Sequence, residues 1–154
     1  MKRGSTIFLK AVIDVIGLIA IALCVFVLPR ALSSDVTGYY QPIIIGMYIS
    51  AVPFFIAIYQ VLKLLNYIDA NKVFSDVAVK SLKYIKYCAF IISAIYAAGL
   101  PYIYYVADRD DAPGVVALSL VIVGASFVIA TATAVFQGLL QNAIDIKSEN
   151  DLTV

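Results

Sequence analysis

The chain contains no histidine, only two cysteines and few charged residues, and each shortage excludes a class of function. Histidine is the commonest general base and the commonest metal ligand, so its absence removes Ser-His and Cys-His dyads. Two cysteines, Cys24 and Cys88, cannot complete a tetrahedral zinc site alone. A net charge of +1 does not suggest the concentrated basic face that nucleic-acid binding requires. We therefore expect a non-enzymatic protein without a metal or cofactor and without direct contact to nucleic acid.

Charged residues make up only 14% of the 154 residues, whereas 63% are hydrophobic. A soluble domain has about a quarter charged residues, so most of this surface is expected to face lipid rather than water. Four apolar runs, at residues 7–28, 43–65, 85–106 and 115–140, account for the excess. Each run has about 20 residues or more, enough to cross a hydrocarbon core ~30 Å thick as a helix.

Strand-like alternation is absent from these runs, and only helices satisfy their backbone groups in lipid without closing a barrel. We predict an all-α integral membrane protein in which a single domain, residues 1–154, forms a bundle of four transmembrane helices.

The basic residues predict the side of the membrane that each connection faces. Nine of the 11 lysine and arginine residues precede or open the first run, lie between the second and third runs or at their adjoining ends, or follow the fourth. The other two, Arg30 and Arg109, fall in the remaining connections. Because basic connections stay in the cytosol, we expect the N- and C-termini, the loop 66–84 and the tail 141–154 to be cytosolic.

Two parts of the chain resemble each other. The second run ends in Ala57-Ile58-Tyr59-Gln60-Val61-Leu62 before Asn66-Tyr67-Ile68-Asp69, and the fourth ends in Ala134-Val135-Phe136-Gln137-Gly138-Leu139 before Asn142-Ala143-Ile144-Asp145. Both endings share an aromatic-glutamine pair followed by an Asn-x-Ile-Asp motif. This repeat predicts two tandem helical hairpins with parallel pseudo-twofold symmetry about the membrane normal.

Asp14, Gln60 and Gln137 lie inside apolar runs and form a candidate intramembrane polar site. An ionisable group at membrane depth suggests a functional site. However, Lys10 lies one helical turn before Asp14 on the same face and can neutralise it. Asp14 therefore fits either a structural ion pair or interhelical hydrogen bond, or a proton, ion or ligand role. The two glutamines fit either a hydrogen bond across the pseudo-axis or the lining of a small polar cavity.

Other polar residues gather in the loop 66–84 and in the tail. Ser75 suits a helix N-cap and Asp76 the first turn that follows. The basic segment 79–86 fits an interfacial helix attracted to anionic lipid or a docking surface for a cytosolic partner. The tail fits a loosely ordered segment, a segment folded back on the loop, or an extended peptide captured by a partner. The candidate partner surface comprises Asn66, Asp69, Asn71, Phe74, Ser75, Asn142, Asp145, Glu149, Asn150 and Asp151.

Three stretches carry a family resemblance. They are Leu64-Leu65-x-x-Ile68-Asp69-x-Asn71-x-x-Phe74-Ser75, Val79-x-x-Leu82-x-x-Ile85-Lys86-x-Cys88, and Ala143-Ile144-x-x-Lys147-x-Glu149-Asn150-Asp151-Leu152-Thr153-Val154. The chain resembles a bacterial four-span family catalogued as domain of unknown function 2975. The resemblance implies a multi-pass protein of the bacterial cytoplasmic membrane and a link to a cytosolic helix-turn-helix regulator. It implies no reaction and no site residues.

We hypothesise a membrane interaction protein that senses a membrane condition or a lipophilic ligand and signals to a cytosolic partner through the loop and tail. One alternative is a small transporter or channel component, which needs a homo-oligomer because four helices with few polar residues make a poor pore. A second alternative is an immunity or resistance protein against a membrane-active peptide. The expected partners are the lipid bilayer, the regulator that the resemblance implies, and a further copy of the chain.

Overall fold

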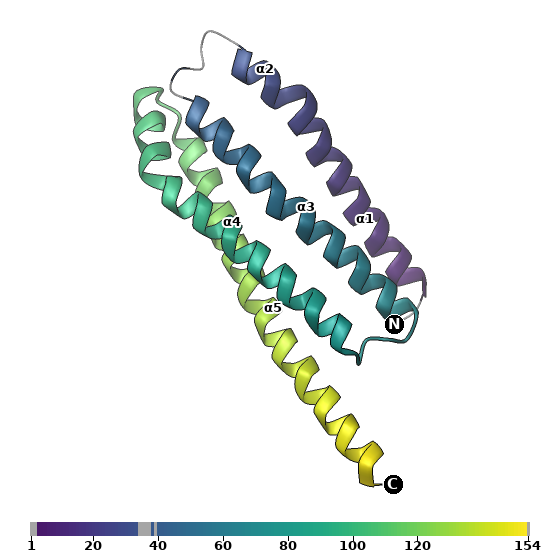
Figure 1. Ribbon diagram of the computed structural model, residues 1–154. Coiled ribbons are helices and arrows are strands. Elements are labelled where there is room, and N and C mark those ends of the chain that lie inside the picture. The colour runs from purple at the N-terminus through teal and green to yellow at the C-terminus, as the bar shows by residue number, and fades with distance from the viewer. Residues whose placement is uncertain (1–2, 34–37, 39, 154) are drawn as a thin grey trace.

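The computed structural model describes residues 3–33, 38 and 40–153, and this part of the chain is mostly helical (Figure 1). Its elements are α1 (Arg3–Ala22), the π-helical segment η1 (Leu23–Val27), α2 (Leu28–Ser33), α3 (Gln41–Asp69), α4 (Asp76–Arg109) and α5 (Pro113–Thr153). Because α1, η1 and α2 follow one another without a break, the described residues form four long helical rods. Each rod is long and apolar enough to cross a membrane, which confirms the predicted all-α four-helix class.

The helices extend past the predicted apolar runs, mainly at one end of the bundle. Only residues 70–75 of the predicted loop 66–84 lie outside a helix, because α3 ends at Asp69 and α4 begins at Asp76. Helix α5 has 41 residues, roughly 60 Å at 1.5 Å per residue, whereas a hydrocarbon core is ~30 Å thick.

The last part of α5 projects beyond the other helices (Figure 1). Residues 141–153 continue α5 to Thr153, so the expectations of a loosely ordered tail and of a tail folded back on the loop are wrong. Capture of the tail by a partner stays a prediction. Val154 lies outside the described residues.

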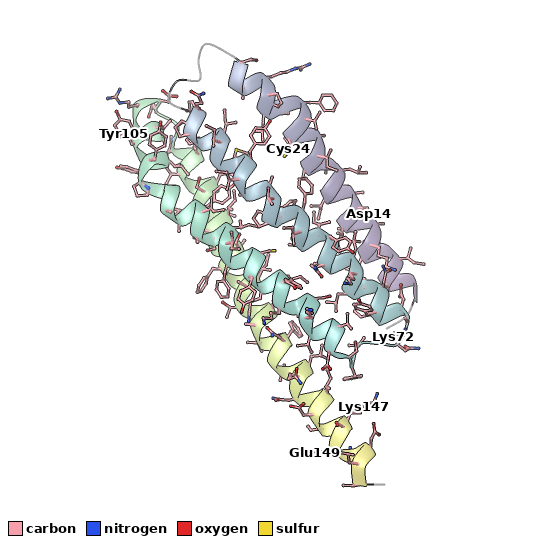
Figure 2. All side chains as sticks on the ribbon, viewed as in Figure 1. Asp14, Cys24, Lys72, Tyr105, Lys147 and Glu149 are labelled. Carbon is pink, nitrogen blue, oxygen red and sulfur yellow. The ribbon has the colours of Figure 1, made fainter. Side chains whose placement is uncertain are left out.

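The start of α1 and the end of α5 lie at the same end of the bundle (Figure 1). We call it the basic end: it contains the start of α1, the α3–α4 turn and the projecting part of α5. Lys72 and Lys147 lie here, whereas Tyr105 lies at the opposite end (Figure 2). This arrangement is the one that an even number of membrane crossings requires.

The four rods pack unequally. Helix α5 packs extensively along α4, and α4 packs along α3, whereas α1 makes a lighter contact with α3. Small residues allow the close approach of α4 and α5: Ala89, Ser93 and Ala130 are buried, and the Ser93 hydroxyl donates to the Val123 carbonyl at 3.3 Å. The first hairpin is therefore looser than the second, and the pseudo-twofold symmetry stays a prediction.

A proline explains the π-helical segment in the first rod. Pro29 has no backbone N–H, so it cannot bond a carbonyl in the preceding turn, and its ring crowds that turn. The N–H of Leu28 instead bonds the Leu23 carbonyl, five residues back, as in a π-helix. The Cys24 carbonyl is thereby left without a backbone donor, and the Tyr48 hydroxyl on α3 donates to it at 2.8 Å. This bond ties the first rod to α3 inside the apolar region.

Candidate functional site

A large, partly open cavity lies between the helices, at the depth of the apolar runs. It has a volume of about 600 Å³, and residues of all four rods line it. Along α3 its lining extends from Met47 to Val61, about 21 Å at 1.5 Å per residue. None of the lining residues carries a formal charge. The site is therefore an elongated apolar cavity.

One pair of hydroxyl groups lies in the wall of this cavity. The Ser50 hydroxyl donates to the Met47 carbonyl at 2.9 Å and lies 3.2 Å from the Tyr96 hydroxyl. This contact joins α3 to α4, and Ser50 is buried. Neither residue was predicted from the sequence, although hydroxyl side chains within apolar runs are a signal of a polar site at membrane depth.

The candidate intramembrane residues do not meet in one site. Asp14, Gln60 and Gln137 are all absent from the cavity lining. Asp14 is exposed on α1 (Figure 2). The Gln60 Oε1 atom is buried and accepts no hydrogen bond from the described residues. The expected bond between the two glutamines is wrong, because Gln137 Oε1 accepts from Lys86 Nζ at 3.0 Å, which joins α5 to α4.

Lys10 has a different partner from the predicted one. Its Nζ atom lies 2.6 Å from Asp69 Oδ2, and both side chains are less than one-third exposed, at 27% and 22%. The predicted ion pair with Asp14 is therefore wrong: Lys10 extends sideways to the end of α3 rather than along its own helix. Asp69, placed by the sequence on the partner surface, instead joins α3 to α1 next to the α3–α4 turn.

Two other residues of the expected partner surface have structural roles in that turn. Asn71 adopts a left-handed backbone with φ of 56°, a conformation that asparagine tolerates better than most residues. Around it, the N–H of Lys72 bonds the Tyr67 carbonyl and the N–H of Asn71 bonds the Ile68 carbonyl, which is the Schellman pattern for ending a helix. The Ser75 hydroxyl accepts from the Ala78 N–H at 3.4 Å, which confirms the predicted N-cap.

The turn also contacts the projecting part of α5. Lys147 Nζ lies 6.0 Å from the centre of the Phe74 ring, at the outer limit for a cation–π contact. Phe74 is 56% exposed, and Leu152 further along α5 is 83% exposed. The α5 residues of the expected partner surface are also exposed: Asn142, Asp145, Glu149, Asn150 and Asp151. Apolar and acidic side chains thus share one exposed region, and its role as a partner surface stays a prediction.

The opposite end has a separate polar link. The carboxylate of Asp110 accepts a hydrogen bond from the Tyr40 phenol, which raises the pKa of Tyr40 above its ordinary value of 10.0. Tyr40 precedes α3 and Asp110 follows α4, so the contact joins two connections outside the apolar runs. Among the described residues no group of three histidine, cysteine or acidic side chains is arranged to hold a metal ion.

The fold and the cavity define a four-span integral membrane protein with an apolar internal site. The chain belongs to the family described as protein of unknown function DUF2975, whose model matches residues 29–154. It is 51% identical to "Uncharacterized membrane protein YoaS" of Bacillus subtilis (strain 168), over an alignment of 160 residues that covers 100% of both chains. No solved structure matches the chain.

Proposed function

We propose that this protein senses a lipophilic ligand from the bilayer and signals to a cytosolic partner at its basic end. The observation that carries the proposal is the cavity of about 600 Å³ among the four rods. Ligand sites are concave and mostly apolar, with typical volumes of ~300–1,000 Å³. An uncharged lining at membrane depth suits a ligand that partitions into lipid.

The first rod is the wall best suited to respond to a ligand. It packs on α3 more lightly than the other rods pack on one another, so its displacement breaks fewer contacts. The Lys10–Asp69 ion pair joins this wall to the residue that ends α3. A ligand that binds more tightly to the conformation with a displaced first rod will shift the population toward that conformation. The change then reaches the α3–α4 turn and the projecting part of α5.

The lining of the cavity favours this function over a transporter or channel component. A pathway for ions or polar solutes needs polar groups that face it, and Asp14, Gln60 and Gln137 lie outside the lining. The excess of basic residues at one end supports a cytosolic position for that end. The bacterial relative is described as a membrane protein, which supports a place in the bacterial cytoplasmic membrane.

Site-directed photocrosslinking in native membranes tests the proposal. A photoreactive residue replaces Glu149, which is exposed on the projecting part of α5, and in a control it replaces Tyr104 at the opposite end. In a second pair, Ala125→Trp occupies part of the cavity from α5, whereas Ala94→Trp places the same side chain on an exposed position of α4 outside the lining.

We expect position 149, but not position 104, to capture one cytosolic protein. Its yield should change at least about threefold in Ala125→Trp and stay unchanged in Ala94→Trp, because only the first variant occupies the ligand's volume. Equal capture in both tryptophan variants, or capture of lipid alone at position 149, would count against the proposal.

A further inference from the structure

We propose that the cavity recognises an elongated lipophilic molecule through one uncharged hydroxyl group, which binds at the Ser50–Tyr96 pair. The inference rests on the proposed function, because it assumes that the cavity binds a ligand. It adds the chemical class of that ligand and the direction in which the ligand lies.

The hydrogen bonds of the pair define what it offers to a ligand. A serine hydroxyl has one proton, and Ser50 donates it to the Met47 carbonyl at 2.9 Å. The 3.2 Å contact between the two hydroxyls must then use the proton of Tyr96. Both donors are thus occupied, while each oxygen keeps acceptor capacity. The pair presents acceptors to the cavity and matches a ligand that brings a donor.

A hydroxyl group fits this pair better than a charged group does. It donates to one of the two oxygens and can itself accept the Tyr96 proton, so no donor is lost. An ionised carboxylate, phosphate or ammonium would give up its hydration without a counter-charge, because the lining is uncharged. An alkyl ether accepts but does not donate, and a plain alkane does neither.

The shape of the cavity sets the direction of the ligand. Ser50 lies near the end of the cavity that is farther from the basic end, one turn from Met47. From Ser50 to Val61 the lining continues for about 16 Å along α3 at 1.5 Å per residue. We therefore place the hydroxyl at Ser50 and Tyr96, with the apolar chain extending toward the basic end, beside the wall formed by the first rod.

Competition photolabelling tests this recognition. The full-length protein is placed in lipid nanodiscs with a diazirine derivative of hexadecanol, and labelled peptides are mapped by mass spectrometry. Hexadecanol, its methyl ether and hexadecane compete at equal mole fractions in the lipid. The variants are Tyr96→Phe, Ser50→Ala and their combination. Tyr59→Phe is the matched control, because Tyr59 is exposed on α3 and lies outside the lining.

We expect hexadecanol to compete about three- to tenfold better than the ether or the alkane, the range of one net hydrogen bond. Each single variant should reduce this preference, the double variant should abolish it, and Tyr59→Phe should retain it. Equal competition by all three compounds, with labels still in the cavity, would overturn hydroxyl recognition but leave the proposed function intact. Labels confined to the lipid-facing surface would overturn the inference, and the capture experiment at position 149 would decide the proposed function separately.

Discussion

The ion pair between Lys10 and Asp69 gives the sharpest prediction about the first rod. The 2.6 Å contact is neither fully exposed nor fully buried. Exposed pairs contribute ~0–1 kcal/mol, whereas removal of one partner from a buried pair costs ~3–5 kcal/mol. We therefore expect Asp69→Asn to weaken the docking of α1 on α3 by about 2 kcal/mol, a change of about thirtyfold in the docking equilibrium.

Disulfide trapping measures this equilibrium in the membrane. A side chain at Gly17 would lie 3.8 Å from the side chain of Ile58 on α3, so Gly17→Cys and Ile58→Cys form a reporter pair after the native cysteines are replaced. We expect Asp69→Asn to slow trapping strongly and the exchanged pair Lys10→Asp/Asp69→Lys to restore most of it.

Asp14→Asn is the matched control, because Asp14 lies one turn from Lys10 on α1 and forms no ion pair with it. Equal losses in Asp14→Asn and Asp69→Asn, or no recovery in the exchanged pair, would refute the reasoning. The first of these outcomes would favour the ion pair that sequence spacing predicts over the one in the structure.

Three further predictions concern single contacts. Ser75→Ala should lower the free energy of unfolding by about 1 kcal/mol, since it removes an N-cap; denaturation in detergent, followed by circular dichroism, measures the loss. Gln60→Leu should raise the unfolding midpoint, because it removes a buried oxygen without a partner among the described residues. Gln137→Leu should lower the midpoint, because it removes the hydrogen-bond acceptor of Lys86; equal effects of the two variants would contradict this. The raised pKa of Tyr40 means that its contact with Asp110 stabilises the fold at neutral pH and that this contribution is lost as the pH rises through the folded-state pKa. Asp110→Asn should move the change in absorbance on ionisation of Tyr40 to lower pH. If this titration does not move, the hydrogen bond to Asp110 is not the cause of the raised pKa of Tyr40.

Local features of the sequence predicted the elements well. Hydropathy summed over about 20 residues is a property of each segment alone, and the four apolar runs accordingly appear as four long helices. The N-cap at Ser75 was also predictable, because capping depends only on the next few residues. The end of α5 was predicted less well, because this helix continues past the fourth apolar run to Thr153.

The candidate polar site was predicted less successfully, for a physical reason. Spacing within one helix identified the neighbour one turn away from Lys10, but a lysine side chain is long enough to reach another helix. The structure gives it Asp69, 59 residues away in the chain. In the same way, the repeat placed the two glutamines in equivalent positions, but the packing of α5 against α4 brings Gln137 within hydrogen-bond distance of Lys86 instead. Which side chain a polar residue contacts on another helix depends on how each helix is rotated about its axis. An apolar sequence constrains that rotation only weakly.

The sequence by itself determined that most of this protein's surface suits lipid rather than water, how many helices can cross the membrane, and where those helices begin and turn. These properties depend on the residues of each segment and their near neighbours in the chain. Only the tertiary structure decided that the first rod packs loosely and that residues of all four rods line a partly open cavity. It also decided that Ser50 and Tyr96, on different helices, meet in the wall of that cavity. Such features arise where several helices meet, so no single segment contains them.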